Sequence, residues 1–90
     1  MKLLSPTEIQ EKFGKLNHWI VIENSIQKKY SFKNFAESMA FVTRTALISE
    51  QMDHHPDILI QYNKVQLTLT THSAHGLTDL DFILASKIDT

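Results

Sequence analysis

Hydrophobic residues recur in this chain with two different periods, and the switches between them predict three helices and four strands. Helical spacing, three or four residues apart, is carried by Ile9 and Phe13, then by Phe35, Met39, Val42, Ala46 and Leu47, and finally by Leu80, Ile83, Leu84 and Ile88. Each set follows a capping sequence: Ser5 with Glu8, Asn34 with Glu37, and Thr78 with Asp81. Pro56 must end the long second helix, since it lacks an amide hydrogen.

Strict alternation of apolar and polar residues predicts two hairpins between these helices. In the clearest strand, Val65, Leu67 and Leu69 alternate with polar residues. The expected strands are 19–22 and 26–32, joined at Asn24-Ser25, and 58–62 and 65–69, joined at Asn63-Lys64. The order helix, strand, strand, helix, strand, strand, helix predicts an α+β fold in which helices cover one face of an antiparallel sheet.

Length and composition narrow the possible functions. Ninety residues allow one domain, 1–90, and so small a core favours stabilisation by a partner subunit. With 9 basic against 10 acidic residues there is no basic stripe, which argues against nucleic-acid binding. No apolar run is long enough for a membrane span or a signal peptide, so we expect a soluble, cytoplasmic protein. The absence of cysteine excludes thiol chemistry and disulfides.

Histidines are the candidate chemical groups. If the second hairpin turns at Asn63-Lys64, counting back along both strands places His55 directly opposite His72, and a slip of one residue would substitute His54. The unperturbed pKa of histidine, about 6.5, suits proton transfer near neutral pH. We therefore expect one acid/base cluster made from two separate segments.

Three carboxylates could orient these histidines. Glu50 lies one helical turn before His54, where it could hold the imidazole in one tautomer. Asp53 and Asp81 could act in the same way. For Asp81 a second interpretation stays open, because the third residue after the Thr78 cap has a complete structural role in closing the helix start.

Several motifs in this part of the chain resemble a known family. They are Glu50-Gln51-Met52-Asp53-His54-His55-Pro56, Tyr62-Asn63-Lys64-Val65, Thr70-Thr71-His72, Gly76-Leu77-Thr78 and Asp81. In order and spacing, from about Tyr30 to Ile88, the chain resembles the pterin-4a-carbinolamine dehydratases. The resemblance implies a four-stranded antiparallel sheet with three helices on one face, and a homodimer or homotetramer.

The resemblance also implies an activity and a site. The activity is the dehydration of 4a-hydroxytetrahydrobiopterin, or a related 4a-hydroxytetrahydropterin, to quinonoid dihydropterin during tetrahydrobiopterin recycling, without a metal or other cofactor. His54, His55 and His72 correspond to the family's active-site histidines; we interpret His54 and His72 as the acid/base pair and His55 as a pterin contact. Glu50, Asp53 and Asp81 would orient these groups or bind the substrate. Two positions, Ile58 and His75, depart from residues common in the family.

Two other functions remain possible from the sequence. His72 and His75 are spaced like a pair of zinc ligands, although adjacent His54 and His55 are awkward to direct at one metal ion. The other is a non-catalytic dimerisation or assembly-factor module, a role that some members of the resembled family have. The presence of all three histidines favours catalysis.

Overall fold

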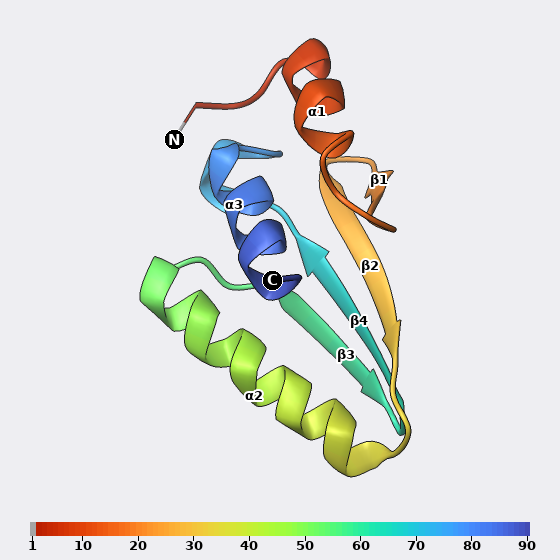
Figure 1. The fold of residues 1–90 in the computed structure, drawn as a ribbon. Helices are drawn as coiled ribbons and strands as arrows, with labels where there is room; N and C mark the ends of the chain where they lie inside the picture. The colour runs from red at the N-terminus through yellow and green to blue at the C-terminus, as the bar shows by residue number, and fades with distance from the viewer. Residues whose placement is uncertain (1) are drawn as a thin grey trace.

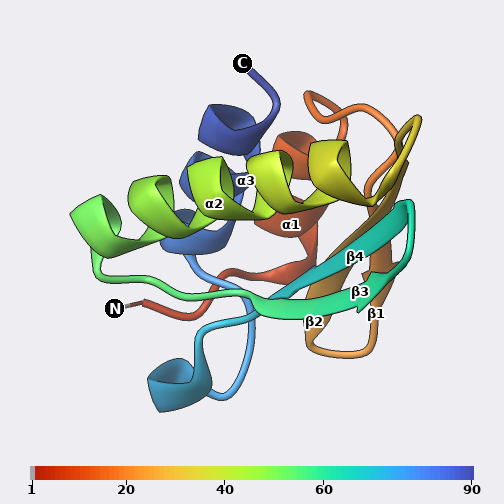
Figure 2. The ribbon, with the colours of Figure 1, turned by 90° about the horizontal axis from the view of Figure 1, so that it is seen from below.

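The computed structural model describes residues 2–90, and it confirms the expected α+β fold. The elements are α1 (Pro6–Phe13), β1 (Ile20–Ile22), β2 (Ser25–Ser31), α2 (Phe35–Met52), β3 (Asp57–Gln61), β4 (Lys64–Leu69), the 3-10 turn η1 (His72–Ala74) and α3 (Asp79–Ile88). The strands form one antiparallel sheet in the order β1-β2-β4-β3. Figures 1 and 2 show the three α-helices on one face of this sheet. Within the described residues, no helix combines the length and hydropathy needed to cross a membrane.

The core lies between β4 and α3. Val65, Leu67 and Leu69 are at most 1% exposed, as their alternation predicted, and they face Leu84 and Ile88 among the buried residues of the same cluster. Burying one such side chain contributes about 1.5–3 kcal/mol. The position of α3, and of any group at its N-terminus, is therefore fixed by well-packed apolar contacts.

The three predicted helix starts are confirmed. Ser5 and Thr78 each form a complete capping box, with Glu8 and Asp81 respectively. The hydrogen bonds from Ser5 hold the pKa of Glu8 below its ordinary value. Asn34 caps α2 by accepting a hydrogen bond from the backbone N–H of Glu37, 2.9 Å away. The capping signals were reliable because each is a local backbone requirement.

In α2, some of the apolar residues that the pattern predicted to face the core are exposed instead. Phe35 and Leu47 are 50% and 63% exposed. The fully buried residues of α2 are instead small and polar, namely Ser38, Thr45 and Ser49. Ser49 satisfies its hydroxyl by donating to the carbonyl of Thr45, 2.7 Å away. The helix therefore leaves an apolar strip on its outer side.

Both hairpin turns lie one residue earlier than predicted. The pairs Ile22–Ser25 and Gln61–Lys64 close loops at 23–24 and 62–63, and the first loop residue of each has a left-handed backbone with φ 53°. Asn63 is the second residue of its loop because Phe32 holds it: the Phe32 N–H donates to the Asn63 carbonyl at 2.8 Å, and the Asn63 amide donates to the Phe32 carbonyl at 3.0 Å. The contact with Phe32, the residue that follows β2, decides the turn, rather than the tolerance of Asn for positive φ.

The C-terminal end of α3 is held by a group of contacts that no sequence pattern indicated. Asp89 accepts hydrogen bonds from Trp19 Nε1 at 2.7 Å, Tyr30 OH at 2.7 Å and Lys28 Nζ at 3.0 Å. Burial by itself raises the pKa of Asp89, but these hydrogen bonds outweigh it and hold the pKa below its ordinary value. Arg44 of α2 also donates to three backbone carbonyls at this end, which fixes α3 against α2.

Candidate functional site

The end of α2 directs two adjacent histidines to opposite sides. The helix ends at Met52, before Pro56, because Asp53 takes a left-handed backbone with φ 50°. This residue caps the helix, and its own side chain faces solvent. The reversal leaves His54 buried, with 8% of its surface exposed, while the side chain of His55 is 54% exposed.

His54 meets Asp81 at the start of α3. His54 Nε2 lies 2.6 Å from Asp81 Oδ1, and Asp81 is fully buried. The other carboxylate oxygen, Oδ2, accepts from the Thr71 hydroxyl at 2.9 Å and from the Thr78 backbone N–H at 3.0 Å. The two interpretations of Asp81 are therefore compatible, since one oxygen caps α3 and the other contacts the imidazole.

Glu50 pairs with a different histidine from the one expected. Its Oε2 contacts His55 Nε2, and both side chains are largely exposed. The expectation that Glu50 would lie beside His54 assumed that the helix continued to His54. The left-handed Asp53 ends the helix first, so the helical spacing that underlay the expectation does not apply.

His72 does not lie directly opposite His55, and that prediction was wrong. β3 begins with Asp57 opposite Thr68, and continuing this register would place His55 opposite Thr70. The pairing of β3 with β4 ends at Asp57 and Thr68, before it reaches His55. His72 instead begins η1, where it is exposed. The short loop that carries His72 is closed by a bridge between Thr71 and Gly76, with hydrogen bonds of 3.0 and 3.3 Å.

His75 ends η1 with a left-handed backbone, φ 61°. Over residues 2–90 no group of three or more His, Asp or Glu residues is arranged to hold a metal ion. The geometry therefore gives the zinc alternative no support. The role of His75 as the C-cap of η1 is a sufficient structural account of its position.

The sequence identified Thr78 only as a helix cap, and it did not single out Thr71 as a partner of Asp81. Thr71 and Thr78 are buried, and their hydroxyl oxygens lie 2.8 Å apart. A signal for Thr71 was available, because it continues the inward-facing series of Leu67 and Leu69 with a polar residue. A polar side chain at an inward position needs a partner, and here that partner is Asp81.

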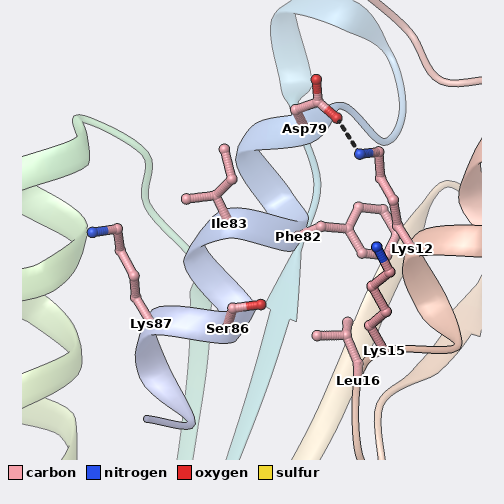
Figure 3. A pocket seen from close by; sticks show the side chains of 8 residues that line it. All are labelled: Lys12, Lys15, Leu16, Asp79, Phe82, Ile83, Ser86 and Lys87. Carbon is pink, nitrogen blue, oxygen red and sulfur yellow. Dashed lines mark ion pairs between the residues drawn. The ribbon is translucent and has the colours of Figure 1, made fainter.

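A separate pocket of about 490 Å³ lies between α1 and α3. Figure 3 shows Lys12 reaching Asp79 across it, at 3.0 Å, above a lining that includes Phe82 and Leu16. None of the candidate histidines lines this pocket. His54 lies instead after the end of α2, against Asp81 of α3, and His72 begins η1.

The arrangement around His54 suits proton transfer. A carboxylate holds one ring nitrogen and leaves the other for a reacting group, which is the geometry used by general acid/base histidines. Tyr30 is no candidate for this role: burial, followed by its hydrogen bond to Asp89, raises the pKa of its hydroxyl far above neutrality. His54 is the only buried imidazole among the described residues.

Comparisons with known proteins agree with this fold and with the motifs. The family model described as pterin 4 alpha carbinolamine dehydratase matches residues 2–90. A relative from Nitrosospira multiformis, provisionally named a pterin-4-alpha-carbinolamine dehydratase, is 48% identical over 90 residues, covering 100% of this chain and 80% of the relative. A similarly named protein of Sulfurisphaera tokodaii is 46% identical over 89 residues, covering 99% of this chain and 96% of that protein.

Two solved structures share the fold. The transcriptional coactivator/pterin dehydratase from Brucella melitensis has a TM-score of 0.94 and 34% identity, covering 98% of this chain and 96% of that one. A pterin dehydratase-like RuBisCO assembly factor of the alpha-carboxysome has a TM-score of 0.65 and 24% identity, covering 79% and 82%, and shows the fold alone. By the extent of these matches, the chain belongs to the pterin 4 alpha carbinolamine dehydratase family.

Proposed function

We propose that this protein removes water from 4a-hydroxytetrahydrobiopterin, or a related 4a-hydroxytetrahydropterin, by histidine general acid/base catalysis. The product would be quinonoid dihydropterin, returned to tetrahydrobiopterin recycling in the cytoplasm. Family membership supports the dehydratase class, a hydro-lyase. The observation that supports the catalytic part best is the buried His54–Asp81 pair, 2.6 Å apart, because a carboxylate beside one ring nitrogen is an arrangement that suits a general acid/base histidine.

The chemistry needs two groups with opposite tasks. One must protonate the leaving hydroxyl as its C–O bond breaks, and the other must accept a nearby proton from the pterin, so that one water leaves and no electrons are transferred. We assign these tasks to His54 and His72, with His55 as a pterin contact. Glu50 would orient His55, Asp81 would orient His54, and Asp53 would shape the turn between them. No metal or other cofactor enters the proposal.

A dehydration assay tests the activity directly. A chemically prepared 4a-hydroxytetrahydropterin is mixed with the protein, and formation of the quinonoid dihydropterin is followed by absorbance against buffer alone. We expect a clear acceleration that is proportional to protein concentration. A rate equal to that of buffer would leave the non-catalytic dimerisation or assembly-factor module as the better account of this chain.

Single replacements test the division of roles. His72→Ala should nearly abolish turnover, because general acid/base groups typically contribute about 10²- to 10⁴-fold in rate. His55→Ala should mainly raise KM. Comparable changes in kcat and KM for the two variants would contradict this division. His18→Ala, at an exposed histidine outside this region, is the control and should change neither parameter.

We also propose that the protein forms a homodimer or homotetramer through the outer side of α2. Phe35, Met39 and Leu47 expose 50%, 37% and 63% of their surfaces there, on a helix whose buried residues are polar. A second copy of the same apolar strip would cover them. Leu47→Glu should lower the mass measured by analytical ultracentrifugation. A monomeric wild type would contradict the proposal.

A further inference from the structure

We propose that Thr71 is a positioning residue: its hydroxyl fixes the carboxylate of Asp81, and this leaves Nδ1 as the nitrogen of His54 that exchanges protons with the substrate. The catalytic part rests on the proposed function, because it takes His54 to be an acid/base group. The positioning part concerns hydrogen bonds alone and can be tested without any activity.

The hydroxyl chain leading to Asp81 has a single consistent direction. The Thr71 hydroxyl donates to Asp81 Oδ2 at 2.9 Å, which uses its only hydrogen. The contact of 2.8 Å between the Thr71 and Thr78 hydroxyls must therefore have Thr78 as the donor. The Thr78 oxygen in turn accepts from the Leu80 backbone N–H at 3.3 Å. Every hydroxyl hydrogen in the chain is thus directed toward the carboxylate.

These donors fix which atoms of Asp81 and His54 face each other. Oδ2 already accepts two hydrogen bonds, from Thr71 and from the Thr78 N–H, so it has no place for a proton of its own. Oδ1 faces His54 Nε2 at 2.6 Å in a fully buried setting. We take this carboxylate to be ionised; an ionised carboxylate can only accept hydrogen bonds, so the proposal places the hydrogen on Nε2. Nδ1 is then the ring nitrogen left to gain or lose a proton.

Thr71 also joins the two proposed acid/base residues. It immediately precedes His72, and its backbone is tied to Gly76 by two hydrogen bonds that close the loop carrying His72. The same residue therefore anchors the His72 loop through its backbone and orients His54 through its hydroxyl and Asp81. Neither function requires Thr71 to touch the substrate.

Nitrogen-15 NMR of the His54 ring tests the assignment in the wild-type protein. In the neutral ring we expect Nε2 to show the shift of a protonated nitrogen and Nδ1 the shift of an unprotonated one. The Nε2 hydrogen, in a short bond to a buried carboxylate, should resonate far downfield and exchange slowly. The opposite tautomer, with the hydrogen on Nδ1, would overturn the inference even if the protein proves to be an active dehydratase.

Paired variants test the part played by the hydroxyl. Thr71→Val keeps the shape but removes the donor, so the downfield Nε2 hydrogen should shift and exchange faster. If the proposed function holds, kcat should also fall about tenfold with little change in KM, because a misplaced catalytic group loses rate. Thr71→Ser restores the hydroxyl and should restore both the Nε2 hydrogen signal and kcat.

The matched control is Thr70→Val. The Thr70 hydroxyl donates to the Asn24 carbonyl at 2.6 Å and has no link to Asp81, so both readings should stay as in wild type. Identical His54 spectra in Thr71→Val and wild type would overturn the positioning role. A wild type without dehydratase activity but with the expected tautomer would instead remove the proposed function and leave the positioning role in place.

Discussion

Two adjacent histidines in this protein each pair with a carboxylate, yet the two pairs lie in opposite surroundings. His54 and Asp81 are buried, and the carboxylate contacts three protein groups: the imidazole, the Thr71 hydroxyl and the Thr78 backbone N–H. His55 and Glu50 are largely exposed, and their contact is a single one between flexible side chains. Water and salt weaken the exposed pair, whereas the buried pair keeps its full directionality. The same residue types can therefore serve orientation in one pair and adjustable binding in the other.

Among the substitutions at the two pairs, Asp81→Asn should cause the largest loss of kcat. The Thr71 hydroxyl and Thr78 N–H require an acceptor at Oδ2, so the new amide must turn its NH₂ toward His54 Nε2. The ring would then adopt the tautomer with hydrogen on Nδ1 and lose its reacting lone pair. We expect kcat to fall by about 10²- to 10⁴-fold. Steady-state kinetics together with the NMR spectrum of His54 check this; unchanged kcat would remove Asp81 from the mechanism.

A third carboxylate, Asp89, makes structural contacts away from the candidate histidines, so we expect its replacement to change stability rather than activity. Because its pKa is lowered in the folded state, its contribution to stability is present above its ordinary pKa of 3.8 and is lost as the pH falls through the folded value. Asp89→Asn should cost about 1 kcal/mol at pH 7, a value reduced for partial exposure, and less near pH 3. Urea unfolding at the two pH values measures the difference. An equal cost at both would contradict the assignment.

Glu50→Gln should have a smaller effect than either of these. An exposed carboxylate–imidazole contact contributes at most about 1 kcal/mol, so KM should rise by less than about fivefold and kcat should stay constant. The rise should shrink at high salt, because the pair is screened. Kinetics at two ionic strengths check this expectation. A loss of kcat as large as that of Asp81→Asn would show that the exposed pair takes part in the chemical step.

Thr45→Val should change stability least, and it provides a contrast with Thr71→Val, in which a hydrogen-bonded hydroxyl is removed. Thr45 is fully buried, and within residues 2–90 its hydroxyl has no hydrogen-bond partner. Removing an unsatisfied hydroxyl should leave the free energy of unfolding unchanged or raise it by up to about 1 kcal/mol. Denaturant unfolding of Thr45→Val and Thr71→Val side by side tests the contrast. A larger loss of stability in Thr45→Val than in Thr71→Val would contradict this expectation.

The sequence predicted the features that depend on local requirements. Helix caps, the alternation in β4 and the order of elements were all confirmed, because each depends on neighbouring residues. The turn at Tyr62-Asn63 was misplaced by one residue, since its position depends on the contact of Asn63 with Phe32, far away in the chain. That error also produced the wrong pairing of His55 with His72.

The pairs at the candidate site depended on where α2 ends. Helical spacing put Glu50 beside His54, but the left-handed Asp53 separates them and gives His54 a partner 27 residues away. The contacts of Asp89 with Trp19 and Tyr30 span still longer separations and leave no local pattern. Such contacts follow from how the layers pack, and spacing within one element does not reveal them.

The most direct test of the account compares the two histidines in one assay. Wild type, His54→Ala and His55→Ala are given the same 4a-hydroxytetrahydropterin, and kcat and KM are measured for each. The account predicts that wild type accelerates dehydration, that His54→Ala loses about 10²- to 10⁴-fold in kcat, and that His55→Ala mainly raises KM. A wild type no faster than buffer, or equal losses of kcat in the two variants, would contradict it.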